Sequence, residues 1–519
     1  MAAVRKSRQT TQSMPSRQTG GRAMRWACNN VRGLIPDCFM RASSRFLIRS
    51  SLCVLALALA GCTVLMPASP TLPTGFAQAL QDAGVPVSAV ALQVQAVDSI
   101  APLRSHNASL PMKPASIMKL VTTSAALDLL GPAYRWTTRV YADGVQTGEL
   151  LQGDLIIQGG GDPRLAHEDL WRLLRRLRAQ GLREIRGDLI LDRSLFGITE
   201  QDAAQFDAQP LRPYNALPDA LLLDGKALTL RFLPDAASQR VQVSSEPLLA
   251  GLELIAPALS NTDCRDWRSG LGTTFEPGVL RFAGSYPLSC GEQRYPIHAV
   301  GLTHAGYFDA VLRQIWQELG GSITGVTREG RVPASAKEIQ QWQSMPLAEM
   351  IGDINKFSNN VMARQLLLSL AADPGGEPVT LEAARERVRS WLAAKGIIDP
   401  ALVLENGAGL SRTERISAAA MARLLQLAWQ SPTMPEFIAS LPVAGVDGTM
   451  QRRVQSHSVR AHAHIKTGSI AEVASMAGYV TARSGRRVMV VCMINHTNAN
   501  TSALREAMDA LLEWVYENG

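Results

Sequence analysis

The chain has 519 residues, of which 46% are hydrophobic and 19% are charged, which fits a globular protein of two or three domains. Its formal charge of +7 is unevenly distributed: ten Lys and Arg and one acidic residue, Asp37, give residues 1–61 a charge of +9, which leaves −2 for the rest. Composition therefore gives no support to nucleic-acid binding, because the basic character belongs to the first segment alone.

Residues 1–61 have the pattern of an export signal. Three arginines between positions 41 and 49 precede an apolar run at 52–60 that is followed by small residues. The run is too short to span a bilayer, which takes about 20 apolar residues. Leu59 to Cys62 resembles a bacterial lipoprotein cleavage box, in which Cys62 becomes acylated; ordinary signal cleavage is the alternative. We expect a periplasmic protein, free or anchored through lipid on Cys62, with residues 62–75 as a tether.

The next part of the chain covers residues 76–131. A short helix and strands around 87–97 and 102–107 precede a mostly apolar helix that begins after Pro114. Ser116 and Lys119 lie three residues apart in its first turn, so their side chains share one face. A lysine in apolar surroundings has a lowered pKa and can take the proton of a serine hydroxyl. A lone Ser-x-x-Lys remains a weak motif.

Residues 132–298 show a different pattern, with many short β segments and turns. The sequence Gly-Asp-Leu-Ile occurs at 153–156 and again at 187–190, with an amphipathic helix at about 168–180 between the copies. This predicts two strands joined by a helical crossover. The glycines at 159–161 lack the Gly-Lys-Ser/Thr ending of a phosphate loop and predict a tight turn. We interpret residues 132–298 as an insertion in a domain formed by 76–131 and 299–519.

From residue 299 onward the pattern is helical and then returns to strands. The predicted helices lie at about 307–319, 347–354, 361–371, 381–395, 418–429 and 434–440, and strands around Lys466, at 475–482 and at 487–494 precede a last helix at 502–516. Strands at the start, a helical middle and closing strands predict an α+β fold, with an antiparallel sheet flanked by helices.

Two further motifs lie in this second part. Ser358-Asn359-Asn360 directly precedes a predicted helix, and Lys466-Thr467-Gly468 lies on the first closing strand. Ser-x-x-Lys, Ser-x-Asn and Lys-Thr-Gly in this order are the signature of penicillin-binding proteins and class A β-lactamases. Taken singly, the second motif could be a helix cap and the third a strand end. Together the three motifs predict an active-site serine acyltransferase.

The chain resembles the D-alanyl-D-alanine carboxypeptidase/endopeptidases of the penicillin-binding protein 4 type (low-molecular-mass class C) over roughly residues 76–519. The 242 positions between Ser116 and Ser358 far exceed the β-lactamase spacing. Further matching stretches lie at 153–163, 263–268, 286–290, 406–412 and 441–449. The chain departs from the family at Asn406, where aspartate is frequent, and at Arg364, where an acidic residue is common.

The resemblance implies a penicillin-binding/β-lactamase-like catalytic domain that cleaves the D-Ala-D-Ala end of peptidoglycan stem peptides through an acyl-enzyme and is inhibited by β-lactams. Ser116 would be the nucleophile, Lys119 the general base and Ser358 the group that protonates the leaving amine. The other expected site residues are Asn360, which holds the lysine or the substrate amide; Lys466 and Thr467, which bind the substrate carboxylate; Gly468, which permits close approach; and Ser469, whose N–H would form the oxyanion hole with that of Ser116.

Three of the seven cysteines lie outside the leader and its cleavage box. Cys264 and Cys290 are expected to form a disulfide in an oxidising compartment, and Cys492 to be a buried free thiol. No Cys/His spacing indicates a metal site, and no cofactor is expected. Two alternatives to the carboxypeptidase are a β-lactamase, disfavoured by the long insertion, and a catalytically silent peptidoglycan-binding lipoprotein, disfavoured by the intact motifs.

Overall fold

The computed structural model describes residues 72–197, 202–276, 278–373 and 375–519. The export signal, the lipidation of Cys62 and most of the tether lie outside the described residues. Within these ranges no helix combines the length and the apolar character that a membrane crossing requires.

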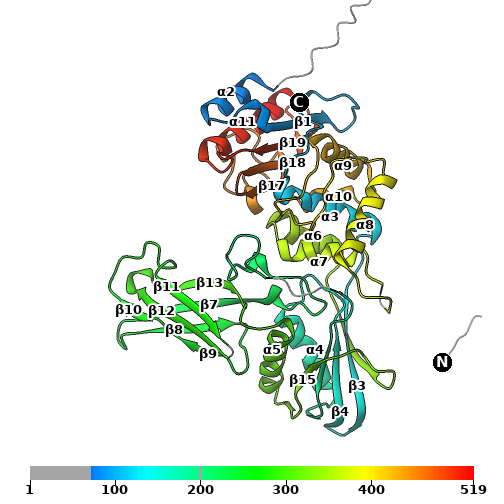
Figure 1. Cartoon of the computed structure of the whole chain (residues 1–519), viewed down its shortest axis with the longest axis vertical. Helices are drawn as coiled ribbons and strands as arrows, with labels where there is room; N and C mark the ends of the chain where they lie inside the picture. The colour runs from blue at the N-terminus through cyan, green and yellow to red at the C-terminus, as the bar shows by residue number, and fades with distance from the viewer. Residues whose placement is uncertain (1–71, 198–201, 277, 374) are drawn as a thin grey trace, which may run out of the picture. The chain divides into compact units, whose positions relative to one another are not determined.

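One sheet of the molecule unites the two ends of the described chain (Figure 1). Its five antiparallel strands follow the order β17-β18-β19-β1-β2, so strands near residue 90 pair with strands near residue 490. The edge position of β17 matters because this strand carries Lys466. The strands are β1 (Val90–Ala96), β2 (Arg104–His106), β17 (Ala463–Ile470), β18 (Val473–Thr481) and β19 (Arg487–Asn495).

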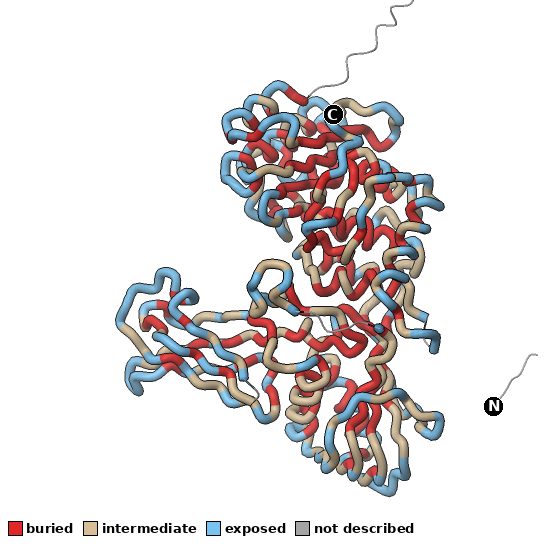
Figure 2. The backbone as a smooth tube through the Cα atoms, viewed as in Figure 1, coloured by how far each residue is buried: buried red, intermediate tan, exposed pale blue. Residues whose placement is uncertain are grey.

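Helices cover both faces of this sheet. Leu92 and Cys492 face a core with α2 (Thr74–Asp82) and α11 (Ser502–Asn518), whereas Ala91 and Val491 face the larger helical core. Neighbouring strand residues thus point to opposite cores, and Figure 2 shows the central strands buried along almost their whole length. Cys492 is the buried free thiol that was expected. The larger core is built from α3 (Lys119–Leu129), α6 (Leu347–Lys356), α7 (Asn360–Ser369), α8 (Leu381–Ala394), α9 (Ala418–Gln430) and α10 (Met434–Ala439).

A second, seven-stranded sheet carries the inserted part of the chain. The predicted crossover is present: α4 (His167–Ala179) connects β4 to the parallel strands β5 and β6. The sheet order is β14-β5-β4-β3-β16, with β6 paired to β4 and β15. Its strands are β3 (Thr137–Thr147), β4 (Leu150–Gln158), β5 (Glu184–Arg186), β6 (Leu189–Asp192), β14 (Ser322–Ile323), β15 (Thr327–Glu329) and β16 (Lys337–Gln343).

The boundary expected at residue 299 divides this sheet and its core. Tyr307, Phe308 and Val311 on α5 (His304–Glu318) are buried in the same core as β3 to β6, and β16 pairs antiparallel with β3. By sheet and core, the insertion therefore continues to about residue 343. The helical periodicity of α5 does not reveal which sheet it covers, because that is decided by strand pairing between distant segments.

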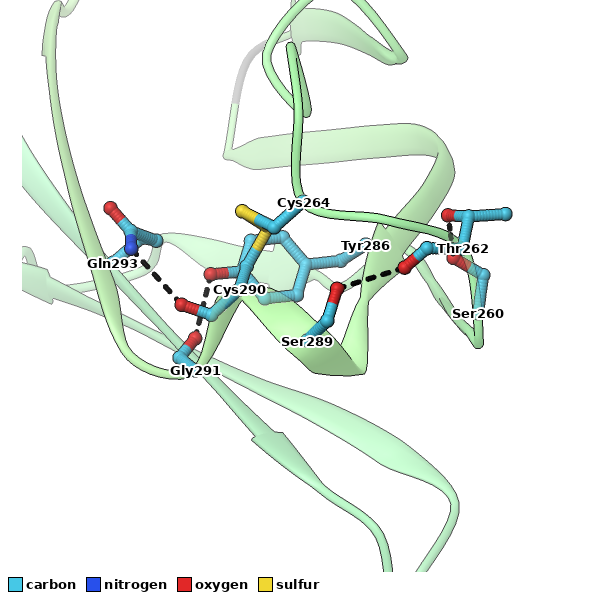
Figure 3. Close-up of a disulfide and its surroundings, with 8 residues drawn as sticks. All are labelled: Ser260, Thr262, Cys264, Tyr286, Ser289, Cys290, Gly291 and Gln293. Atoms are coloured by element: carbon cyan, nitrogen blue, oxygen red, sulfur yellow. Dashed lines mark hydrogen bonds between the residues drawn. A yellow bond between two sulfur atoms is a disulfide. The ribbon is translucent and has the colours of Figure 1, made fainter.

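Two small sheets and a disulfide complete the insertion. Cys264 and Cys290 are bonded as expected, with Cα atoms 4.8 Å apart. Figure 3 shows Tyr286 beside the disulfide, where its hydroxyl donates to the Gly291 carbonyl at 2.8 Å. The strands are β7 (Ala227–Asp235), β8 (Arg240–Glu246) and β13 (Gln293–His298) in one sheet, and β9 (Glu253–Ile255), β10 (Ala258–Ser260), β11 (Leu271–Glu276) and β12 (Val279–Pro287) in the other.

Candidate active site

Ser116 lies in a short 3₁₀ turn, η2 (Ala115–Met118), that continues directly into α3. Ala115 has φ +46°, a left-handed conformation that non-glycine residues seldom adopt. The turn is held to the sheet by Asn495, whose Oδ1 accepts from the Lys113 N–H at 2.8 Å. Such local strain persists only where neighbouring contacts impose it. The turn places the half-buried Ser116 beside the fully buried Lys119.

Lys119 has three hydrogen-bond partners, one for each ammonium proton. Its Nζ donates to Ser116 Oγ at 3.0 Å, to Asn360 Oδ1 at 2.5 Å and to the Ala408 carbonyl at 2.5 Å. Burial lowers the pKa of Lys119 well below its usual value, and the neighbouring charge of Lys466 lowers it further. Both effects favour the neutral amine, which lies within hydrogen-bond distance of the serine hydroxyl.

The three consecutive residues of the second motif, Ser358 to Asn360, each make a different contact. Asn359 caps α7, because its Oδ1 accepts from the Met362 N–H at 3.0 Å. On either side of this cap, Ser358 accepts a hydrogen bond from Lys466 and Asn360 accepts one from Lys119. Ser358 has φ +58°, which turns the chain sharply before the helix. The helix cap and the contacts with the two lysines thus coexist in one motif.

The third motif brings the edge strand β17 against the serine turn. Lys466 is fully buried, and its Nζ donates to Ser358 Oγ at 2.9 Å and to the Thr467 carbonyl at 2.7 Å. Burial lowers its pKa to about 7. A Cβ on Gly468 would lie 2.4 Å from Ser475 Oγ and 2.7 Å from the Ser116 nitrogen. Only glycine fits between the strand and the turn.

The outer edge of β17 is covered along only part of its length. The Ile465 N–H donates to Pro442 O at 2.8 Å, and Ala463 O accepts from Ala444 N–H at 2.9 Å. Backbone groups alternate in direction along a strand, so the N–H groups of Thr467 and Ser469 point to this same edge. Their side chains have partners nearby: Thr467 Oγ1 contacts Thr449 Oγ1 at 2.8 Å and Ser469 Oγ contacts Asn500 Oδ1 at 2.7 Å.

A loop at residues 405–414 completes the surroundings of Lys119, and sequence reasoning assigned it no role. Glu414 is buried and its Oε1 accepts the backbone N–H groups of residues 405, 406 and 407 at 2.9–3.0 Å. This arrangement presents the Ala408 carbonyl to Lys119. Gly409 has φ +77°, and a Cβ there would overlap the Ala115 carbonyl. The two glycines on either side of Ala408 were the feature of the sequence that could have indicated a role for this loop.

Asn406 and Arg364, the two departures from the family pattern, both lie at this loop. Asn406 supports it: Nδ2 donates to Leu410 O at 2.8 Å and Oδ1 accepts from the Ala408 N–H at 3.0 Å. Arg364, one turn after Asn360 on α7, is half-buried near Glu414 and Glu405, and desolvation lowers its pKa. Its positive charge also acts to lower the pKa of Lys119.

A cavity of about 660 Å³ adjoins the second motif. Ser358 and Asn360 line one side, and Arg164, Tyr214 and Asp224 of the insertion line the other. Arg164 also forms an ion pair with Asp353 of α6 at 3.0 Å. The insertion therefore lines a cavity that reaches Ser358 and Asn360, whereas Ser116 does not line it.

His167, Glu168 and Asp224 form the group among the described residues that has the spacing of metal ligands. Its contacts are those of an ion-pair network: the His167 ring nitrogens lie 3.1 Å from Asp224 and 3.2 Å from Glu246. The hydrogen bond with Asp224 is the main cause that raises the pKa of His167 to about 9. These hydrogen bonds and ion pairs hold the three side chains together.

Known proteins with similar sequences or folds are named as D-alanyl-D-alanine carboxypeptidases or as a penicillin binding protein. The chain is 28% identical over 424 residues to a D-alanyl-D-alanine carboxypeptidase of Actinomadura, with 78% of each chain covered. It is 25% identical to the D-alanyl-D-alanine carboxypeptidase DacB of Haemophilus influenzae, covering 76% of this chain and 82% of that one. The crystal structure of penicillin binding protein 4 from the same organism has the same fold, with a TM-score of 0.73, 22% identity, and coverage of 85% of this chain and 99% of that one. Residues 73–515 match the model of the D-Ala-D-Ala carboxypeptidase 3 (S13) family, and the chain belongs to that family.

Proposed function

We propose that this protein is a serine-type D-Ala-D-Ala carboxypeptidase that acts on peptidoglycan stem peptides through an acyl-enzyme on Ser116. The observation that carries this proposal is the 3.0 Å hydrogen bond between Ser116 Oγ and the buried Lys119, whose pKa burial lowers. Membership of the S13 family and the names of the curated relatives support the substrate class.

In the acylation step, Ser116 Oγ attacks the carbonyl carbon of the penultimate D-alanine while its proton passes to neutral Lys119. The backbone N–H groups of Ser116 and Ser469 stabilise the oxyanion, a role supported by the close approach of β17 to the Ser116 nitrogen. The C–N bond then breaks, and the leaving amine receives through the Ser358 hydroxyl the proton that Lys119 took from Ser116, so Lys119 is neutral again for deacylation. Lys466, which donates a hydrogen bond to Ser358, keeps its charge. Asn360 holds Lys119 during these transfers.

In the deacylation step, water attacks the ester on Ser116, with Lys119 accepting a proton and returning it to Ser116 Oγ. Substrate orientation comes from the terminal carboxylate, which meets the positive charge of Lys466 and the hydroxyl of Thr467 at the open edge of β17. Gly468 lets the substrate backbone lie close to the strand. None of these steps draws on a cofactor.

The same acyl-enzyme forms when the bond after D-alanine belongs to a cross-bridge, so we include DD-endopeptidase activity in the proposal. β-Lactams mimic the D-Ala-D-Ala end and would acylate Ser116; a structure of the Haemophilus relative is complexed with a β-lactam. We further propose export to the periplasm and lipid attachment at Cys62, on the residue pattern of the leader. The domain arrangement belongs to the proposal too: a catalytic domain before residue 132 and after about 343, interrupted by the insertion.

The decisive experiment is intact-protein mass spectrometry after incubation of residues 62–519 with benzylpenicillin, with a Ser116→Ala variant as control. We expect one penicilloyl group per chain, absent from the variant, and release of D-alanine from a D-Ala-D-Ala pentapeptide. Rapid drug turnover without an adduct would indicate a β-lactamase. A folded protein without adduct or turnover would indicate a peptidoglycan-binding protein. A cross-linked muropeptide in parallel measures the endopeptidase activity.

A further inference from the structure

Helix α7 is held at its centre by the insertion. Gln365 is fully buried, and its side-chain amide makes two hydrogen bonds with the backbone of Asp219, one by donating to the Asp219 carbonyl and one, at 3.1 Å, by accepting from the Asp219 N–H. At the first turn of the same helix, Val361 packs with Ala216 and Leu222. Residues 216–222 therefore contact α7 close to the Ser-x-Asn motif, whose last residue, Asn360, begins this helix.

Asp219 is in turn held by an ion pair with the half-buried Arg193. Asp219 is 7% exposed, and its carboxylate accepts three hydrogen bonds from Arg193, two of them from Nε at 2.9 and 3.1 Å. Arg193 follows the last residue of β6, and its Nη1 also donates to Glu329 of β15 at 2.6 Å. Two strands of the large sheet and the segment 216–222 thus converge on one guanidinium.

These contacts form a continuous path into the catalytic residues. The path runs from Glu329 and Arg193 to Asp219, then to Gln365, and along α7 to its first residue, Asn360, which contacts Lys119. Rigid helices transmit small displacements along their length, and misplacement of a catalytic group by about 1 Å can cost about 100-fold in rate. The insertion is therefore mechanically connected to the Ser-x-Asn motif.

We propose that Arg193 is a positioning residue for the reaction: through Asp219 and Gln365 it fixes α7, and so holds Ser358 and Asn360 against the two catalytic lysines. This inference rests on the proposed function and extends it, because it assigns the insertion a part in catalysis.

Loss of this support has a specific consequence at Lys119. The charged groups that act on Lys119 come from three directions: Lys466 on β17, Glu414 in the loop at 405–414 and Arg364 on α7. Burial is the largest cause of its lowered pKa. A displaced α7 admits water, which relieves the desolvation and raises the pKa of Lys119. The acidic limb of the acylation rate then moves to higher pH.

The test measures the rate of penicilloyl formation on the full 62–519 chain as a function of pH, by intact-protein mass, in Arg193→Gln and Arg193→Lys. The rate constant and the final stoichiometry are read from the same time course. We expect Arg193→Gln to be acylated to one group per chain, at a rate lowered about tenfold or more, with the acidic limb shifted to higher pH. Arg193→Lys keeps the charge and should recover part of the rate.

Arg313→Gln is the matched control. Arg313 pairs with Asp309 at 2.6 Å and donates to Thr327 Oγ1 at 3.0 Å, which joins α5 to the same sheet. None of its described contacts reaches α7 or residues 216–222. We expect this variant to lose stability while its acylation rate constant, and the acidic limb of the pH dependence of that rate, stay as in the wild-type chain.

The outcomes separate positioning from folding. A lowered stoichiometry with a wild-type rate constant in Arg193→Gln would mean a purely structural role and would overturn the proposal. Equal rate losses in Arg193→Gln and Arg313→Gln would overturn it as well. If Arg193→Gln does not fold, Arg193→Lys decides on the same two readouts. Absence of acylation in the wild-type chain would instead contradict the proposed function.

Discussion

At the residue scale, two buried lysines are assigned opposite protonation states. In the proposed mechanism Lys119 acts as a base when neutral, whereas Lys466 attracts a carboxylate when charged. Burial lowers the pKa of both, to about 7 for Lys466. Since an amine is charged below its pKa and neutral above it, Lys466 loses its charge as the pH rises through about 7.

We therefore predict that the second-order rate of acylation by benzylpenicillin falls above about pH 7 and also falls at acidic pH, where Lys119 is protonated. Lys466→Arg should move the alkaline limb to higher pH, because a guanidinium stays charged. Stopped-flow or quenched mass measurements between pH 5 and 10 provide the profile. A rate that stays constant between pH 7 and 9.5 in the wild-type chain would contradict this assignment.

Gly468 gives a second prediction at this scale. A methyl group there would meet backbone atoms of Ser116 and Pro114 at 2.7 and 2.9 Å, and backbone cannot move aside as a flexible side chain can. Gly468→Ala should lower the acylation rate about 100-fold. Gly352→Ala in α6 is the control, since nothing lies within 4 Å of the added carbon. Similar rates for the two variants would show that the close approach is dispensable.

At the element scale, α7 depends on Asn359 for its first turn. The cap satisfies the Met362 N–H, which has no partner within the helix. Asn359→Ala should lower the free energy of unfolding by about 1 kcal/mol, and Asn359→Ser, which keeps an acceptor, by less. Denaturant unfolding monitored by circular dichroism measures both. Equal losses in the two variants would mean that the side-chain acceptor does not stabilise the helix.

At the scale of the whole molecule, the insertion has its own core and its own covalent link. The Cys264–Cys290 disulfide closes a loop with a sequence separation of 26, for which loop entropy gives about 3.5 kcal/mol of stabilisation. A Cys264→Ser/Cys290→Ser double variant should lower the melting temperature of the insertion and leave the rate of Ser116 acylation near the wild-type value. Calorimetry and the penicillin assay test the two halves of this prediction. A large loss of acylation in folded protein would link the disulfide to the site.

Prediction of the fold from the sequence succeeded where the signal was local. The repeated Gly-Asp-Leu-Ile around an amphipathic helix indicated the β4–α4–β6 crossover, and the strands and helices after residue 347 lie close to their expected positions. The domain boundary that the sequence placed at residue 299 divides a sheet of the structure, because β16 pairs with β3 across a long stretch of sequence. No local pattern in α5 distinguishes the two cores.

For the candidate site, the residue types and their order along the chain were enough to nominate Ser116, Lys119, Ser358, Asn360 and Lys466 before any coordinates. Motif chemistry is local, and three motifs in a set order leave few alternatives. Only the tertiary structure assigned Asn359 to the helix cap, brought Ala408 O to Lys119 through the buried Glu414, and linked Arg193 to α7 through Asp219 and Gln365. These contacts join residues that no spacing rule connects, because burial and hydrogen-bond partners are set by how distant segments pack.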